Sequence, residues 1–143
     1  MLKIIKSTEN PISLHVRRTD ILDPKNPYGG ICDIDYYKQA ESLIKQKVGI
    51  PSFFVFSDDI AWCKNNLNFI NPIYFVSNPK IPDYEELILM SSCKHNVIAN
   101  SSFSWWAAWL NRNPEKIIIA PKKWIKRNEK IHKDTVPSEW IRI

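Results

Sequence analysis

The chain has 143 residues, the length of one domain, and a domain of this size can fold without disulfides or metals. Its net charge of +5 favours an anionic ligand, and its three scattered cysteines, Cys32, Cys63 and Cys93, form no paired motif. No apolar run approaches the ~20 residues of a membrane span and the N-terminus has no signal-peptide core, so we expect a reduced, cytoplasmic protein.

Five short apolar runs, typical of buried strands, alternate with helical patterns along the chain. The expected strands are 12–16, 53–57, 73–76, 96–99 and 116–120, and the expected helices are 35–47, 60–67, 83–92 and 103–111. Apolar strands that alternate with helices form a parallel sheet covered on both faces. The sequence therefore predicts a single α/β domain over 1–143, a doubly wound, Rossmann-like parallel sheet.

Ligands of such sheets bind beyond the carboxyl ends of the strands, so the loops at that edge are the candidates for function. They are 17–33, 57–59, 77–82, 100–103 and 121–124.

The first expected strand runs into two adjacent arginines, Arg17 and Arg18. A guanidinium group binds phosphate through two parallel hydrogen bonds and stays charged at all working pH values. Alternation along the strand places His15 and Arg17 on one side and Arg18 on the other. One arginine could face an anionic ligand while the other pairs with Asp20 or another acid. Two structural ion pairs at a loop entrance explain the same residues equally well.

The second expected strand ends at two acids, Asp58 and Asp59. One carboxylate can accept hydrogen bonds from N1–H and N2–H₂ of guanine, a donor pair that adenine lacks. Either acid could instead cap the next helix, which is the interpretation we favour for Asp59. A third interpretation is an Mg²⁺-binding pair, but adjacent acids at a strand end point apart.

The fourth expected strand is followed by Asn100, Ser101 and Ser102, which open a helix. Free backbone N–H groups and the positive end of the helix dipole make this a second candidate anion site. Trp105 and Trp109 share one face of that helix, and we expect them in the core.

A basic segment, 121–133, carries five lysines and Arg127 against one glutamate. A solvated basic tail explains it, as does a surface that contacts anionic lipid or nucleic acid. Cys93 and His95 form a lone C-x-H with no second pair at zinc-finger spacing, so we expect no metal there.

Together these segments resemble a known family. They are His15-Val16-Arg17-Arg18-Thr19-Asp20, Phe53-Phe54-Val55-Phe56-Ser57-Asp58-Asp59, Val97 to Trp106 and Ile118 to Trp124. In order and spacing they resemble the bacterial α-1,2-fucosyltransferases of glycosyltransferase family 11. The first segment is also similar to the H-x-R-R-x-D motif of α-1,6- and protein O-fucosyltransferases. The resemblance extends from Glu9 onward and matches the C-terminal, donor-binding half of such an enzyme. The N-terminal acceptor half, with its glycine-rich start, is expected to be absent.

The resemblance implies a GT-B-like fold of two facing domains. It implies inverting, metal-independent transfer of fucose from GDP-β-L-fucose to a galactose hydroxyl of a glycan, without a cofactor. By position, Arg17 would hold the pyrophosphate, and His15 and Asp58 would contact guanine. Arg18 would support the loop of the donor site. Asn100, Ser101 and Ser102 would belong to the same site, with both serines on phosphate or fucose.

Bond cleavage builds negative charge on GDP, which Arg17 and the helix N-terminus would stabilise. Asp20 and Asp23 lie nearest as candidates for the general base, and the absent half is the alternative source of that base.

Three alternatives accompany this interpretation. The first is an inactive GDP-binding fragment. The second is a nucleic-acid-binding protein, disfavoured because basic and aromatic residues form no continuous strip and most tryptophans look buried. The third concerns location: the basic 121–133 segment could hold the protein peripherally at the inner face of a bacterial membrane.

Overall fold

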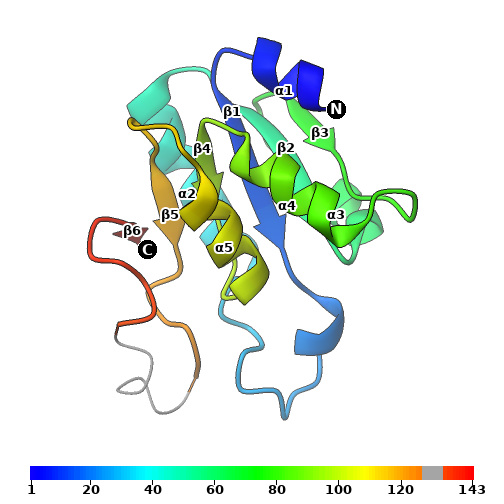
Figure 1. The fold of residues 1–143 in the computed structure, drawn as a ribbon. Coiled ribbons are helices and arrows are strands. Elements are labelled where there is room, and N and C mark those ends of the chain that lie inside the picture. The colour runs from blue at the N-terminus through cyan, green and yellow to red at the C-terminus, as the bar shows by residue number, and fades with distance from the viewer. Residues whose placement is uncertain (127–133) are drawn as a thin grey trace.

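A six-stranded, all-parallel sheet forms the centre of the molecule (Figure 1). A computed structural model describes residues 1–126 and 134–143. The strand order is β3-β2-β1-β4-β5-β6, so the parallel, Rossmann-like sheet expected from the sequence is confirmed. The strands are β1 (Pro11–Val16), β2 (Ser52–Ser57), β3 (Ile73–Phe75), β4 (His95–Val97), β5 (Ile118–Ala120) and β6 (Ile141–Arg142).

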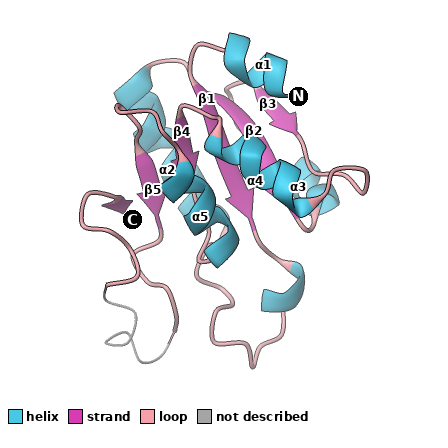
Figure 2. Cartoon of the chain, in the orientation of Figure 1, coloured by secondary structure: helices cyan, strands magenta, loops and turns pink. Residues whose placement is uncertain are grey.

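Helices cover both faces of this sheet (Figure 2). They are α1 (Leu2–Ser7), α2 (Ile34–Val48), α3 (Ile60–Asn66), α4 (Asp83–Ser91) and α5 (Ser102–Leu110), with a short 3₁₀ turn at Thr19–Ile21. Helices α2 and α3 pack on one face, whereas α1, α4 and α5 pack on the other. This double cover explains why every residue of β1 is buried, on the polar as well as the apolar side of the strand.

Alternation along β1 sets which face each side chain meets. Leu14 and Val16 enter the core beneath α2 and α3, so His15 between them faces the side of α5, where its ring lies 5.7 Å from that of Phe103. The chain winds from β1 through β2 to β3 in one direction and from β4 to β6 in the other. The winding therefore reverses between β1 and β4, which is where ligands bind in sheets of this type.

Some expectations fail. Helix α1 and strand β6 were not predicted, because a six-residue helix and a two-residue strand give almost no periodic signal in a sequence. The expected core position of Trp109 is wrong: it stacks on Trp105 with ring centroids 5.2 Å apart, yet its side of α5 leaves it 51% exposed. Trp106 is also half exposed, so the premise that most tryptophans are buried does not hold.

The basic segment 121–133 lies only partly within the described structure. Lys122, Lys123 and Lys126 are exposed, and residues 127–133 lie outside the described residues. Within residues 1–126 and 134–143, no helix is long and apolar enough to cross a membrane.

Candidate functional site

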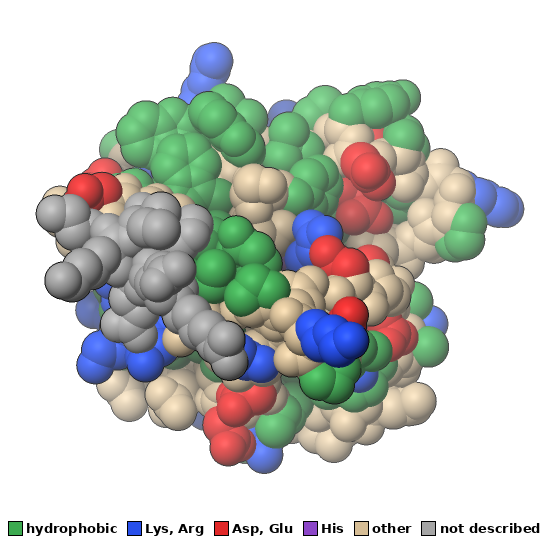
Figure 3. Space-filling model, turned by 90° about the horizontal axis from the view of Figure 1, so that it is seen from below, with side chains coloured by type: hydrophobic (Ala, Val, Ile, Leu, Met, Phe, Trp, Pro, Cys, Tyr) green, Lys and Arg blue, Asp and Glu red, His purple; other side chains and the backbone are tan. Residues whose placement is uncertain are grey.

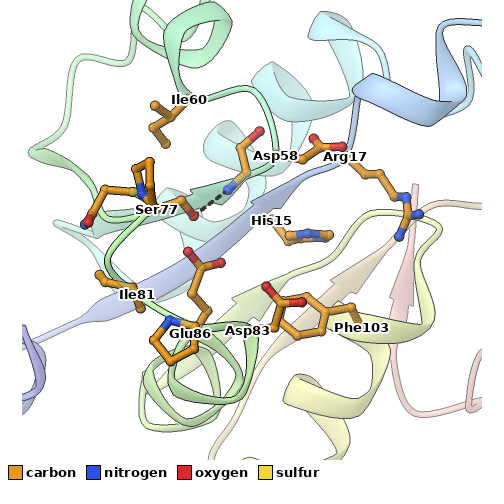
Figure 4. A pocket seen from close by; sticks show the side chains of 13 residues that line it. His15, Arg17, Asp58, Ile60, Ser77, Ile81, Asp83, Glu86 and Phe103 are labelled. Atoms are coloured by element: carbon orange, nitrogen blue, oxygen red, sulfur yellow. Dashed lines mark hydrogen bonds between the residues drawn. The ribbon is translucent and has the colours of Figure 1, made fainter.

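A cavity of about 860 Å³ opens at the carboxyl ends of β1, β2 and β3 (Figure 4). It lies between the loops that follow these strands, the start of α4 and Phe103 of α5. Its lining residues are His15, Arg17, Ser57, Asp58, Ile60, Ser77, Asn78, Pro79, Ile81, Pro82, Asp83, Glu86 and Phe103. Four of the five candidate loops selected from the sequence, 17–33, 57–59, 77–82 and 100–103, therefore contribute side chains to one cavity.

Arg17 lies where the winding of the sheet reverses. Its Nε and Nη2 donate to Asp20 at 2.8 and 2.6 Å, and its Nη1 donates to Ser101 Oγ at 3.3 Å. The contact with Ser101 joins the end of β1 to the start of α5. The hydrogen bond with Asp20 raises the pKa of Arg17 and lowers the pKa of Asp20, so both groups are charged at neutral pH.

Arg18 turns away from the cavity, as alternation along the strand predicts. Its Nε lies 3.3 Å from Asp59, and its guanidinium lies 3.9 Å from the ring centroid of Trp62. Both partners belong to the start of α3, so Arg18 fastens the loop after β1 to that helix. This position fits the expected supporting role, because Arg18 does not line the cavity.

The carboxylates of Asp58 and Asp59 accept hydrogen bonds from different segments of the chain. Asp58 accepts hydrogen bonds from the backbone N–H of Arg18 and from both the N–H and the hydroxyl of Thr19, at 2.8, 3.0 and 2.6 Å. Asp59 caps α3 by accepting from the N–H of Trp62 at 3.0 Å, which confirms the capping interpretation for this residue. Among the described residues, no group of three or more histidines, cysteines and acids gathers in a way that could hold a metal ion.

His15 is a buried polar side chain that lines the cavity. It is 7% exposed, and its Nδ1 has no hydrogen-bond partner among the described residues. Burial lowers the pKa of His15 to about 4, so the ring is neutral at physiological pH and retains one donor and one acceptor nitrogen. Such an unpaired buried group is unusual in a protein without a ligand at that point.

The start of α5 lies next to the cavity: Phe103 lines it, whereas Asn100, Ser101 and Ser102 do not. Ser101 is 4% exposed and no side chain caps the helix, so the first backbone N–H groups of α5 carry no side-chain partner. Ser102 is the first residue of the helix. Asn100 instead joins two loops, because its amide donates to the carbonyls of Tyr28 and Trp124 at 2.9 and 3.1 Å.

The two candidates for the general base lie outside the cavity lining. Asp20 does not line the cavity but is hydrogen-bonded to Arg17, which does. Asp23 closes a turn by accepting from the N–H of Lys25 at 2.9 Å. Both side chains belong to exposed residues.

Ser77 and the two cavity acids of α4, Asp83 and Glu86, were not singled out from the sequence. Loop 77–82 was a candidate as a whole, but acids in the first turn of a helix are ordinary partners of the helix dipole. Burial raises the pKa of Glu86, and a hydrogen bond from Ser77 partly offsets this effect. Only the tertiary structure turns this acid toward the carboxyl ends of the strands.

The model of glycosyl transferase family 11 matches residues 1–143, the whole chain. The chain belongs to glycosyl transferase family 11. It is 41% identical to the O-antigen biosynthesis glycosyltransferase WbnK of Escherichia coli, over 99% of this chain and 47% of that protein. It is 38% identical to an α-1,2-colitosyltransferase of Escherichia coli, over 98% of this chain and 49% of that protein.

Mammalian proteins also match. The galactoside 2-α-L-fucosyltransferase SEC1 of Bos taurus is 31% identical over 69% of this chain and 28% of that protein. No solved structure matches the chain. This family 11 chain spans about half the length of the bacterial relatives that it matches.

Proposed function

We propose that this family 11 chain binds GDP-β-L-fucose and provides the donor site for inverting, metal-independent transfer of fucose to a galactose hydroxyl of a glycan, forming an α-1,2 linkage. The observation that carries the proposal is the pairing of Arg17 with the uncapped start of α5, 3.3 Å apart through Ser101, beside a cavity large enough for a nucleotide. Two sources of positive charge thus meet at the point where the sheet reverses.

The chemistry needs positive charge where the leaving group forms. Cleavage of the bond between fucose C1 and the phosphate oxygen leaves negative charge on GDP. Arg17 would stabilise that charge through its fork of N–H groups, and Ser101, Ser102 and the helix N–H groups would stabilise it from the other side. No divalent ion is required in this arrangement.

Asp20 fits the role of general base only when its ion pair with Arg17 is broken. Its contact with Arg17 lowers its pKa, so it accepts a proton poorly while the pair is intact. If the diphosphate draws Arg17 away, Asp20 becomes more basic at the moment when an acceptor hydroxyl must lose its proton. Asp23 remains the second candidate, without support from the cavity geometry.

Colitose is the second candidate for the donor sugar. One relative, 38% identical over 98% of this chain, carries the name α-1,2-colitosyltransferase. Colitose is fucose without its 3-hydroxyl group, so both GDP-sugars fit the same phosphate and base contacts. A titration with the two GDP-sugars separates them: a donor site for fucose should bind GDP-fucose more tightly.

The test of the proposal has two parts. The 143-residue chain should bind GDP in calorimetry, because every proposed donor contact lies within it. Transfer to a galactoside should be slow with this chain alone and should become faster when the N-terminal half of a bacterial relative is added. The reason is that orienting two substrates can lower the activation barrier by about 7–11 kcal/mol. A chain that binds GDP but never supports transfer is the inactive fragment, and a chain that binds no GDP overturns the proposal.

We also propose the cytoplasmic face of a bacterial membrane as the setting. The exposed Lys122, Lys123 and Lys126 would contact anionic lipid there, each contributing about 1 kcal/mol near such a surface. Sedimentation with vesicles tests this: the chain should pellet with anionic vesicles and not with neutral ones, and equal behaviour would remove the proposal.

A further inference from the structure

The two ends of the cavity differ in chemistry (Figure 4). Arg17 lies at one end, beside the start of α5. Ile60 and Ile81 lie toward the other (Figure 4), where they provide apolar surface suited to the flat face of a base. A nucleoside diphosphate with its phosphates at Arg17 would therefore place its base near these side chains.

Glu86 lies toward this apolar end, and its carboxylate points into the cavity (Figure 4). The N–H of Ser57 donates to Ser77 Oγ at 2.9 Å. Burial raises the pKa of Glu86, and the nearby Ser77 hydroxyl opposes this shift. Among the described residues, no lysine or arginine forms an ion pair with Glu86, so the acid keeps acceptor capacity for a ligand.

A second observation points independently to a ligand in this cavity. His15 is more than nine-tenths buried, its Nδ1 has no partner among the described residues, and its ring lies along the cavity between Arg17 and Glu86 (Figure 4). A buried polar atom left unpaired by the protein is expected to find its partner in what binds there. The cavity thus has one buried atom without a partner, His15 Nδ1, and an acceptor without an ion-pair partner, Glu86, toward its apolar end.

Asp58, the acid first expected to contact guanine, is already engaged. Three hydrogen bonds from Arg18 and Thr19 hold both of its oxygens to the loop after β1. Of the roughly four acceptor sites of a carboxylate only one is left, so Asp58 could accept both N1–H and N2–H₂ of guanine only by giving up one of these contacts. Glu86 has no such commitment to backbone among the described residues.

We propose that Glu86 is the residue that selects guanine, accepting hydrogen bonds from N1–H and N2–H₂ of the base. The inference rests on the proposed function and adds its specificity element. Adenine has no adjacent pair of donors on that edge and would leave the acid unpaired in a partly buried site. Hypoxanthine keeps N1–H but lacks the amino group, so it forms only one of the two charge-assisted bonds.

The experiment is calorimetry of the 143-residue chain with GDP, IDP and ADP, for wild type, Glu86→Gln and Glu85→Gln. Wild type should bind GDP about tenfold or more tightly than IDP, the difference expected for one hydrogen bond to a charged acceptor. In Glu86→Gln the amide turns an NH₂ toward the amino group of guanine, so GDP binding should weaken about tenfold or more and the GDP-to-IDP ratio should approach one. Glu85→Gln removes the same charge from an exposed neighbour outside the cavity lining and should behave as wild type.

Each other outcome counts against the inference. Equal binding of GDP and IDP by wild type would overturn it, and this arm needs no variant to fold. An equal loss for GDP, IDP and ADP in Glu86→Gln would assign the acid to the ribose instead. An unchanged GDP-to-IDP ratio in the folded variant would assign guanine to another group. If wild type binds none of the three nucleotides, the proposed function fails and the inference falls with it.

Discussion

Arg17 and Asp20, three residues apart, form a two-pronged ion pair in which Nε and Nη2 each donate to a different carboxylate oxygen. The pair fixes the plane of the guanidinium and leaves Nη1 pointing toward Ser101 at the start of α5. Because the two side chains are 39% and 50% exposed, the pair contributes little to stability. The pair also occupies Nε and Nη2 of Arg17, so Asp20 competes with an anionic ligand for these two donors.

Replacement of Arg17 should remove most donor binding. Truncating one partner of a charge-assisted hydrogen bond typically costs about 2–5 kcal/mol, so Arg17→Ala should weaken GDP binding well over tenfold. Arg17→Lys should recover only part, because a point charge does not reproduce the fork. Calorimetry on folded variants measures both, with Arg112→Ala as an exposed control that removes the same charge outside the cavity lining. Near-normal GDP affinity in Arg17→Ala would contradict the assignment.

Replacement of Asp20 should act in the opposite direction on binding. Asp20→Asn removes the negative charge that competes with the diphosphate for Arg17, so GDP affinity should rise roughly two- to fivefold, the range of an exposed ion pair. Glu115→Gln removes an exposed charge outside the cavity lining and serves as the control. A weaker GDP complex in Asp20→Asn would mean that aiming Arg17 matters more than the competing charge.

GDP binding should not depend on a divalent ion. Asp58 and Asp59 bond to different groups, namely the loop after β1 and the start of α3, and this does not suit a shared metal. GDP titrations with Mg²⁺ and with excess EDTA should therefore give the same affinity. Loss of binding in EDTA, restored by Mg²⁺, would make these acids metal ligands.

His95 should make the protein less stable in acid. It is 3% exposed, its Nδ1 accepts from the N–H of Ile117 at 3.0 Å, and burial lowers its pKa to about 4. In the unfolded chain this histidine has a pKa near 6.5, so below pH 6.5 the unfolded state takes up a proton that the folded state does not. The unfolding free energy is therefore highest above pH 6.5 and falls by about 3 kcal/mol as the pH drops toward 4.

Urea unfolding at several pH values checks this effect. His95→Asn keeps an acceptor near Ile117 but cannot titrate, so its unfolding free energy should fall less steeply than that of wild type between about pH 6.5 and 4. Parallel curves for the two proteins would show that protonation of His95 does not drive the loss.

The sheet was predictable because its signal is strong. Residues 12–16 and 53–57 are almost unbroken apolar runs, and the structure buries them between two layers of helices. The positions of Arg17 and Ser101 followed from the same argument, since the carboxyl ends of β1 and β4 meet at one edge. That these two side chains touch could be expected from topology alone.

The sequence could not predict which of the acids would be held by hydrogen bonds within the protein and which would be available to a ligand. Asp58 and Glu86 both line the cavity, but Asp58 accepts hydrogen bonds from the backbone of Arg18 and Thr19, whereas Glu86 has no such backbone partner among the described residues. Sequence spacing does not distinguish them, because the choice depends on how loop 17–33 folds over β2. The expectation for Trp109 failed for a related reason: helical spacing gives a shared face, but which face is buried depends on the neighbouring layer.

Both edge strands of the sheet are too short to pair readily with a strand of another molecule. Strand β3 has three residues and β6 has two, so neither presents a long row of unpaired backbone groups to another chain. On the face formed by the carboxyl ends of the strands, hydrophobic side chains gather along one side (Figure 3). With Trp106 and Trp109 half exposed on α5, self-association of this chain at high concentration should proceed through aromatic side chains and not through strand pairing. Such contacts would be dissolved by mild detergent and would leave no cross-β signature.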